Sequence, residues 1–256
     1  MRLITWNVAR RVTVLPDQAA ALASREPDVV ALQEVTARGH GLWETALRRI
    51  GLPHLVYSPG PRMGVLLAAR EPIEPVDPLP VPRPESTAAG SVDGIAVHAV
   101  HVPNAANGWV KVRTLEAVRA GLAAAAGPRV LCGDLNTPRR EKPDGTVISF
   151  ARDSKERLRE ERGTEWDDGE LGVVPRLADL GFADAIRSLH GYAKPERSWT
   201  FPENKGGWRL DHVFVSAELE LAASGYHHDW RIAGLSDHSA LEADFSVRAR
   251  WPPAAR

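Results

Sequence analysis

The sequence predicts an α/β sandwich with a mixed sheet, and three observations support this fold class. In the first half of the chain, short apolar runs typical of strands alternate with longer helical stretches. In the second half, strand-like runs follow one another with little helix between them. The length of 256 residues and the hydrophobic share of 43% suffice to bury a substantial core, and they fit one large domain better than two.

The predicted elements follow from local patterns along the chain. The predicted strands cover 2–8, 28–34, 54–58, 63–69, 95–102, 129–134, 210–216, 220–227 and 240–248. A helix is predicted over 17–27, where Pro16 suits a first helical turn. Helices over 41–51 and 110–127 each end on a glycine, which is the usual residue just past a helix. These helices complete the alternating pattern.

Two segments are predicted to lie on the surface. The segment 72–94 is rich in proline, serine and glycine, so we expect a surface connection there. The segment 138–170 is densely charged, with an exposed helix expected near 152–162, because mixed charges at helical spacing usually face water. We expect residues 1–250 to form one domain and 251–256 a C-terminal tail.

Composition restricts the possible classes of protein. The 32 basic and 33 acidic residues give a net charge of −1, so an enzyme acting on nucleic acid would have to gather positive charge locally. The one cysteine, Cys132, excludes an internal disulfide framework and a multi-cysteine zinc site, and its apolar neighbours predict a buried thiol. Because no apolar segment reaches about 18 residues, we expect neither a signal peptide nor a membrane span. We expect a cytoplasmic monomer.

Polar side chains recur at the ends of predicted strands. They are Asn7, Glu34, His101 with Asn104, Asp134 with Asn136, Asp211, and Asp237 with His238. Any one of them is explained as a turn former or a helix cap. Six strand ends of this kind would together build one polar surface if they share an edge of a sheet.

This set of residues selects a chemistry. The oxygen donors suit a hard cation such as Mg²⁺ or Mn²⁺, whereas a zinc cage would need cysteine or clustered histidine. Mg²⁺ typically polarises a phosphoryl oxygen, and an aspartate with a histidine supplies a general base for water or holds the charge that develops on phosphate. The sequence therefore predicts hydrolysis of a phosphodiester or phosphomonoester.

Six motifs in order give the sequence a family resemblance. They are TWN (5–7), LQE (32–34), HVPN (101–104), GDLN (133–136), WRLDH (208–212) and SDH (236–238). The sequence resembles the exonuclease–endonuclease–phosphatase superfamily, which includes exonuclease III-type abasic endonucleases, DNase I, and Mg²⁺-dependent inositol phosphatases and sphingomyelinases. The resemblance spans almost the whole chain, and it implies a four-layer α/β sandwich with two mixed sheets flanked by helices and the site at one rim.

The resemblance implies a metal site and a base. Glu34 would be the principal ligand of Mg²⁺ or Mn²⁺, with Asn7 and Asp237 contributing directly or through water. Asp134 would orient or deprotonate the attacking water, and Asn136 would hold a phosphate oxygen.

The resemblance also implies contacts with the substrate. His238 would face the scissile phosphate, and Asp211 would bond to its far nitrogen and fix its tautomer and charge. Asn104 would donate a hydrogen bond to a substrate phosphate, and His101 would assist the phosphate or the leaving group.

Departures from the abasic endonucleases bear on the substrate. Their acidic residue two positions after the first asparagine is Ala9 here, which favours a single metal ion held mainly by Glu34. His101 stands where the abasic endonucleases carry tyrosine. DNase I and the sphingomyelinase- and phosphatase-like members carry histidine at this position. Asn107 replaces an arginine that reaches across DNA, a role that Lys111 or Arg113 could take over.

The segment 199–212 contains features expected of a nucleic-acid enzyme. We expect Trp199 to belong to the core, with Ser198 replacing the aromatic residue that the family carries before it. Trp208 could be core or could stack on substrate, and Arg209 beside it would contact substrate. The basic residues that could contact backbone phosphates are Lys205, Arg139, Arg140 and Lys142, and the histidines expected to be structural are His227 and His228.

Three functions remain open at this point. The first is a Mg²⁺- or Mn²⁺-dependent phosphodiesterase that acts on DNA as an endonuclease or 3′–5′ exonuclease. The second is a phosphatase or phosphodiesterase for a small substrate such as a phosphoinositide, a nucleotide or a phospholipid head group. The third is an inactive binding module, against which the complete set of Glu34, Asp134, Asp211 and His238 argues.

Overall fold

The computed structural model describes residues 1–202 and 205–248, so the tail expected at 251–256 lies outside the described residues. The strands are β1 (Arg2–Asn7), β2 (Val29–Val35), β3 (His54–Ser58), β4 (Gly64–Ala69), β5 (Thr87–Val92), β6 (Ile95–His101), β7 (Arg129–Asp134), β8 (Arg140–Glu141), β9 (Val147–Ile148), β10 (Ala183–Asp184), β11 (Trp199–Thr200), β12 (Gly207–Trp208), β13 (Asp211–Val215), β14 (Leu219–His227) and β15 (Ala240–Val247). The helices are α1 (Leu15–Ala23), α2 (Ala37–Arg49), α3 (Trp109–Ala124), α4 (Gly163–Leu171), α5 (Ala185–His190) and α6 (His228–Ile232). Within the described residues, every helix is too short or too polar to cross a membrane.

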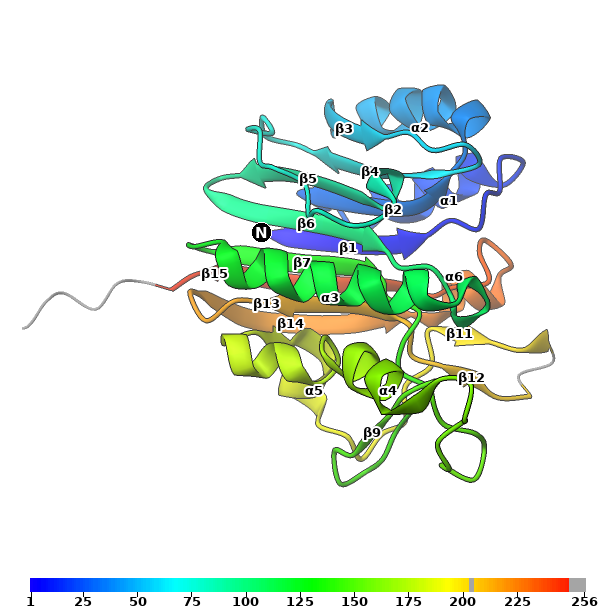
Figure 1. The fold of residues 1–256 in the computed structure, drawn as a ribbon. Coiled ribbons are helices and arrows are strands. Elements are labelled where there is room, and N and C mark those ends of the chain that lie inside the picture. Colours follow the sequence, from blue (N-terminus) through cyan, green and yellow to red (C-terminus); the bar gives the residue numbers. More distant parts are fainter. Residues whose placement is uncertain (203–204, 249–256) are drawn as a thin grey trace, which may run out of the picture.

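Two mixed sheets form the centre of the fold, which confirms the predicted α/β sandwich (Figure 1). The six-stranded sheet has the order β14-β15-β1-β2-β4-β3, and the five-stranded sheet has the order β10-β13-β7-β6-β5. Parallel pairing joins β1 to β2 and β6 to β7, and the other neighbours within these two sheets run antiparallel.

The two sheets bury one face each against the other. Alternate residues of a strand point to the same face, so each strand supplies every second side chain to the core between the sheets. In β1 and β7 these are Leu3 on one side and Val130 and Cys132 on the other, all fully buried. Cys132 is a buried thiol, as expected, and burial raises the pKa of that thiol to about 12.

Helices cover the outer faces of both sheets and complete the four layers. The outer face of the six-stranded sheet, with Ile4 and Trp6 of β1, packs against Leu22 of α1 and Trp43 of α2. The outer face of the five-stranded sheet packs against α3 through a second cluster that includes Leu115. In Figure 1, α3 lies in front of the five-stranded sheet.

One edge of the sandwich collects the ends of strands from both sheets. The carboxyl ends of β1, β2, β6 and β7 meet there, because these strands form two parallel pairs. The amino ends of β13 and β15 lie at the same edge, since β13 runs antiparallel to β7 and β15 runs antiparallel to β1. The polar strand ends noted in the sequence are therefore brought together at one rim.

The segment 72–94 was wrongly predicted to be a surface connection throughout. Residues 87–92 form β5, an edge strand paired with β6. The prediction missed this strand because its sequence, TAAGSV, consists mainly of small residues with little strand preference. Gly90 is required by packing, since a Cβ atom there would lie 2.1 Å from Ile73 Cγ2.

The exposed helix expected near 152–162 is also wrong. The chain forms turns over these residues, and helix α4 begins only at Gly163. The Asp153 carboxylate accepts hydrogen bonds from the backbone N–H groups of Lys155 and Arg157, and Glu156 has a positive φ of 64°. Local bonds of this kind compete with helical hydrogen bonds and favour a turn.

A buried network of ion pairs lies at the β10 edge of the five-stranded sheet. The Arg209 guanidinium, whose side chain is 1% exposed, donates hydrogen bonds to Glu141 and Asp184. Arg187 of α5 binds Glu141 from the other side at 2.7 Å. Burial alone would raise the pKa of Glu141, but the two arginines outweigh it and lower that pKa to about 2; Arg209 and His212 hold the pKa of Asp184 well below its usual value.

This network predicts a loss of stability in acid. Because the pKa of Glu141 is depressed in the folded protein, its contribution is complete above its ordinary pKa of 4.5 and is lost as the pH falls toward about 2. Glu141→Gln should lower the free energy of unfolding at pH 7 by about 3 kcal/mol, because it leaves two buried arginines short of a partner. The free energy of unfolding, measured with urea, should also depend less on pH between about 4.5 and 2 in this variant. The exposed Glu160→Gln serves as control, and an equal loss in both variants would contradict the prediction.

Candidate active site

Three neighbouring strands place a histidine and two aspartates in one row at the rim. In the β-sheet register, His101 of β6 lies opposite Asp134 of β7, and Asp134 lies opposite Asp211 of β13. All three occupy positions that point toward the space between the two sheets, like the apolar residues two positions further into each strand. The apolar core is thereby continued at the rim by polar groups.

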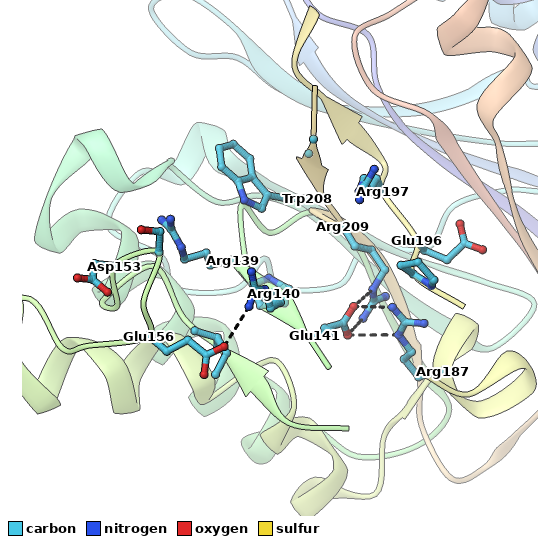
Figure 2. Close-up of a pocket in the computed structure, with 16 residues that line it drawn as sticks. Arg139, Arg140, Glu141, Asp153, Glu156, Arg187, Glu196, Arg197, Trp208 and Arg209 are labelled. Atoms are coloured by element: carbon cyan, nitrogen blue, oxygen red, sulfur yellow. Dashed lines mark hydrogen bonds and ion pairs between the residues drawn. The ribbon is translucent and has the colours of Figure 1, made fainter. Parts of the chain in front are cut away.

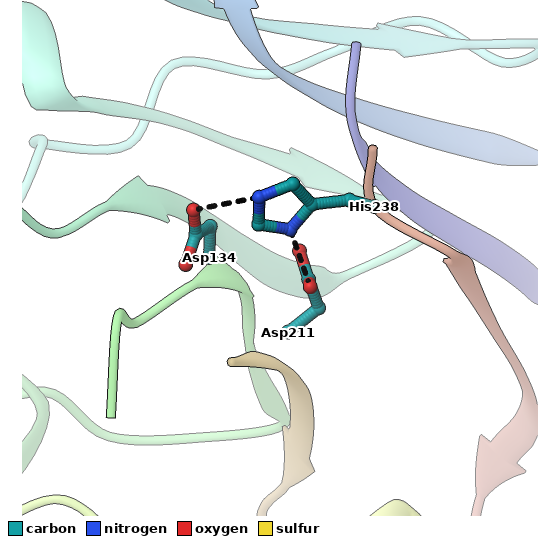
Figure 3. Close-up of side chains that lie close together, drawn as sticks. All are labelled: Asp134, Asp211 and His238. Carbon is teal, nitrogen blue, oxygen red and sulfur yellow. Dashed lines mark hydrogen bonds and ion pairs between the residues drawn. The ribbon is translucent and has the colours of Figure 1, made fainter. Parts of the chain in front are cut away.

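His238 is held between the two aspartates (Figure 3). Its Nδ1 lies 2.8 Å from Asp211 Oδ2, and its Nε2 lies 3.9 Å from Asp134 Oδ2. Two backbone bonds fix its position, because Trp6 Nε1 donates to the His238 carbonyl and the His238 N–H donates to Ser236 Oγ. The imidazole is therefore oriented before any substrate binds.

Charge at this site favours the protonated imidazole. Burial alone would lower the pKa of His238, but the negative charges of Asp211 and Asp134 and the hydrogen bond to Asp211 raise it to about 10. His238 thus carries a positive charge at neutral pH, with one nitrogen bound to Asp211 and the other directed toward Asp134. Such a cation can stabilise an anionic oxygen brought next to it.

Asp134 is almost fully buried and receives several hydrogen bonds. Its Oδ2 accepts a bond from Asn7 Nδ2 at 3.0 Å and another from Asn136 Nδ2 at 3.3 Å, and its Oδ1 accepts the Asn136 N–H at 2.9 Å. Burial raises the pKa of Asp134, and the positive charge of His238 opposes this shift. A raised carboxyl pKa makes Asp134 a better acceptor for a proton from water.

Glu34 reaches the rim through a distortion of its strand. Strict alternation would turn Glu34 toward the helices, but its φ is +58° and the pairing with β4 shifts register between Leu32 and Val35. Its Oε1 consequently lies 3.4 Å from Asn7 Nδ2 and 3.8 Å from His101 Nε2. The other oxygen, Oε2, pairs with Arg10 at 2.9 Å.

Oxygen donors at this rim fit a hard divalent cation. Glu34 presents a half-buried carboxylate and Asp237 an exposed one to the same pocket. Asn7 Oδ1 accepts the Ala9 N–H, so the amide nitrogen of Asn7 faces the carboxylates. Asp134, Asp211 and His238 form a second group, whose ligand atoms lie within 4.8 Å of one another.

These residues surround an open pocket of about 880 Å³. The residues named from the sequence that line it are Glu34, His101, Asn104, Asn107, Asp134, Asn136, Trp199, Trp208, Asp237 and His238. Two arginines, Arg62 and Arg83, line it as well, and Arg83 donates a hydrogen bond to Asn107 Oδ1. No sequence pattern selects these two arginines, because they lie in loops between strands and belong to no motif.

Two asparagines at the pocket are partly committed to the backbone. Asn136 Nδ2 donates to the Val102 carbonyl at 2.8 Å, so this side chain also positions Asp134. Asn104 Oδ1 accepts bonds from the Ala106 N–H and from Asn107 Nδ2. Asn104 is exposed at the pocket, where it is placed to contact a ligand.

An aromatic cluster forms one wall of the pocket. Trp199 and Trp208 lie opposite each other on β11 and β12, with ring centroids 5.1 Å apart and planes 6° apart. Phe201 and Phe150 contact the pair edge-on. The expectation that Trp199 belongs to the core is wrong, since Trp199 lines the pocket and its Nε1 donates to Asp237 Oδ2 at 3.2 Å.

Two basic residues are removed from the set expected to contact substrate. The Arg209 side chain is buried in the ion-pair network with Glu141 and Asp184, which consumes its donors. Lys111 is fully buried on α3, where Nζ lies 2.5 Å from Glu170 Oε1. The sequence shows that a residue is basic, but packing decides whether its charge faces the solvent or a buried partner.

Glu170 instead acts as an anchor behind the pocket wall. Its carboxylate accepts hydrogen bonds from Lys111, from Thr137 Oγ1 and from the Phe150 N–H. Phe150 in turn packs against Trp208. The buried pair therefore connects helices α3 and α4 to the loop that carries the aromatic wall.

Two histidines and two basic residues named from the sequence have structural partners. His227 contacts Glu242 at 3.0 Å, and His228 lies 3.0 Å from Glu196, in agreement with the structural role expected for both. Lys142 and Arg140 both pair with Glu156.

The comparisons with known proteins agree with this geometry. Residues 4–238 match the Endonuclease/Exonuclease/phosphatase family. None of the curated proteins compared with the chain matches it.

Solved structures of similar fold cover nearly the whole chain. An AP endonuclease from Archaeoglobus fulgidus is 24% identical with a TM-score of 0.74, over 96% of this chain and 100% of that one. A 3′–5′ exonuclease from Neisseria meningitidis is 26% identical with a TM-score of 0.69, over 96% and 100%. A 3′ phosphatase from Neisseria, bound to a product DNA hairpin, is 24% identical with a TM-score of 0.70, over 96% and 99%.

The contact between Asp211 and His238 predicts a measurable pKa and a matching effect on stability. The pKa of His238 is raised in the folded protein. The stability that His238 contributes is therefore complete below its ordinary pKa of 6.5 and is lost as the pH rises through about 10. Asp211→Asn should lower the pKa of His238 and remove this loss, because a neutral amide cannot stabilise the imidazolium. Titration of the metal-free protein by NMR, followed at the His238 ring, measures the shift. Asp77→Asn, in an exposed loop, is the control; an unchanged pKa in Asp211→Asn would contradict the interpretation.

Proposed function

The chain belongs to the endonuclease/exonuclease/phosphatase family, and on that premise we propose that it hydrolyses phosphodiester bonds of DNA with the help of Mg²⁺ or Mn²⁺. One observation carries the proposal: the imidazole of His238 is fixed between two buried carboxylates, Asp211 and Asp134, at an open pocket. This arrangement provides a proton acceptor and a fixed cation close together, as attack of water on a phosphate ester requires.

The proposed metal ligands are Glu34 and Asp237. Asn7, expected from the sequence to be a further ligand, directs its amide nitrogen at Glu34 and Asp134 and would instead position these carboxylates. We favour this set over the group of Asp134, Asp211 and His238, because a positively charged His238 would repel a cation and Asp211 Oδ2 is already bound to it. Mg²⁺ or Mn²⁺ bound there would polarise the phosphoryl oxygen and keep several waters of its own.

Asp134 is the proposed base for the attacking water. Its carboxylate is fixed by Asn7 and Asn136, and burial raises its pKa, which makes it a stronger proton acceptor. A hydrogen bond from water to Asp134 would hold the nucleophile in position for in-line attack. The proton of that water would pass to Asp134.

His238 and His101 are the proposed contacts with the phosphate. His238 Nε2, charged and buried, would donate to the oxygen on which negative charge develops, while Asp211 holds the ring in place. His101 Nε2 lies 3.8 Å from both Glu34 and Asp134, so its ring reaches the same space and could protonate a leaving oxygen. Asn104 would bind a phosphate oxygen from the side of the loop that follows β6.

The lining of the pocket favours DNA over a small phosphate ester. Arg62 and Arg83 bring positive charge to a chain of almost neutral net charge, and Trp199 and Trp208 offer an apolar wall for a base or sugar. The Neisseria 3′ phosphatase bound to a DNA hairpin shows that this fold accommodates such a substrate in that protein. A 3′-phosphate terminus is therefore included among the substrates tested below.

The proposal predicts metal-dependent hydrolysis of DNA. Wild-type protein with Mg²⁺ or Mn²⁺ should cleave supercoiled plasmid, duplex, abasic-site or 3′-phosphorylated DNA faster than it hydrolyses phosphoinositides or nucleotides. His238→Ala and Asp134→Asn should each lower kcat by roughly 100- to 10,000-fold, the usual range for loss of one acid–base group. His190→Ala, an exposed histidine outside the pocket, should retain full activity. DNA left intact by the wild type in both metals would refute the proposal.

The proposed metal site predicts a separate effect of Glu34. Glu34→Gln removes the principal carboxylate, so it should weaken Mn²⁺ binding by roughly 10-fold or more, measured by calorimetry with the metal alone. Glu44→Gln, in an exposed helical ion pair with Arg48, should bind Mn²⁺ like the wild type. Equal Mn²⁺ affinity in Glu34→Gln and the wild type would show that Glu34 is not a metal ligand.

A further inference from the structure

A second pocket, drawn in Figure 2, shares the side chain of Trp208 with the first. It has a volume of about 360 Å³ and lies between the loop after β7 and the hairpin of β11 and β12. Because Trp208 lines both pockets, they meet at this side chain. None of the catalytic roles proposed above uses this second pocket.

The carboxylates that line the second pocket already have cationic partners. Glu141 binds Arg187 and Arg209, and Glu156 binds Lys142 and Arg140. The other two are Asp153, which pairs with Arg157, and Glu196, which pairs with Lys194 and His228. Negative charge in this pocket is therefore neutralised by groups that belong to the protein.

Two arginines of the pocket lack such a partner. Among the residues that the structure describes, no carboxylate forms an ion pair with Arg139 or Arg197, although both line the pocket. They extend from different elements and lie on either side of Trp208 in Figure 2. The backbone of Arg139 is fixed by its N–H bond to the Ile148 carbonyl, so this guanidinium starts from a defined position. Two uncommitted guanidinium groups facing one cavity are suited to a phosphate, which accepts their paired donors.

Both arginines are close in sequence to the catalytic rim. Arg139 follows Asp134 by five residues, which limits the separation of their Cα atoms to about 17 Å. Arg197 precedes Trp199 by two residues, and Trp199 bridges to His238 through a β-bridge. With about 3.4 Å of helix axis per nucleotide in one strand, the second pocket is within roughly five nucleotides of the scissile phosphate.

We propose that this second pocket binds backbone phosphates of the DNA strand next to the scissile phosphate, with Arg139 and Arg197 as the ligands of these phosphates. This inference rests on the proposed function and extends it, because it makes the substrate a strand that passes Trp208 and occupies both pockets. A small phosphate ester would fill the larger pocket alone. Recognition by backbone phosphate carries no base specificity, so the second pocket would strengthen binding to all sequences equally.

Binding of a fluorescein-labelled DNA duplex, followed by anisotropy in EDTA over a series of salt concentrations, tests the inference without catalysis. Arg139→Ala and Arg197→Ala should each raise Kd roughly fivefold and lower the slope of log K against log salt by about 0.9, the value for one lost phosphate contact. Arg197→Lys keeps the charge, so it should keep the slope while it weakens binding less than Arg197→Ala. Arg49→Ala, an exposed arginine on α2 with no carboxylate partner in the described residues, should match the wild type in Kd and slope.

A second measurement separates failure of this inference from failure of the proposed function. The ratio of kcat/KM for a DNA duplex to kcat/KM for bis(p-nitrophenyl) phosphate should fall in Arg139→Ala and Arg197→Ala, because the small diester has no flanking phosphate. If the wild type cleaves DNA and both alanine variants keep its Kd, salt slope and kcat/KM ratio, the second pocket is not a phosphate site and the proposed function stands. If the wild type neither binds nor cleaves DNA, both proposals fall.

Discussion

The face-to-face packing of two β-sheets is the constraint on which the whole site depends. Each strand must present every second side chain to the core between the sheets, and the same alternation continues to the rim, where water replaces apolar neighbours. Asn7, His101, Asp134 and Asp211 occupy these inward positions at the ends of β1, β6 and β7 and at the start of β13. Because the sheets pack about 10 Å apart, polar groups from both can reach one small volume. The packing of the two sheets therefore brings the polar side chains at their rim into one site.

Charge balance then determines how these groups behave. Two carboxylates as deeply buried as Asp134 and Asp211 would be costly without a cation, and His238 supplies that cation between them. The same balance raises the pKa of the imidazole and keeps it charged. Glu34 reaches the same volume only because its strand is distorted at a positive φ, which puts a carboxylate where strict alternation would have placed none.

The loops add what the strands cannot provide. The chain has almost no net charge, yet arginines line two pockets that share Trp208, and the carboxylates of the second pocket are paired with other cations. Behind the aromatic wall, the fully buried pair of Lys111 and Glu170 ties the loop of Thr137 and Phe150 to helices α3 and α4. The aromatic wall between the two pockets therefore rests on a buried, hydrogen-bonded support.

The sequence by itself determined the fold class and the set of polar strand ends, because hydrophobic alternation and motif order are local and are set by backbone periodicity. It missed β5, whose small residues lack strand preference, and it predicted a helix at 152–162 where the Asp153 side chain forms a turn instead. Only the tertiary structure decided which basic side chains face outward. Arg209 and Lys111 are buried with carboxylates distant in sequence, whereas Arg139 and Arg197 line a pocket. Side-chain partners depend on contacts between segments far apart in the chain, and no local pattern encodes them.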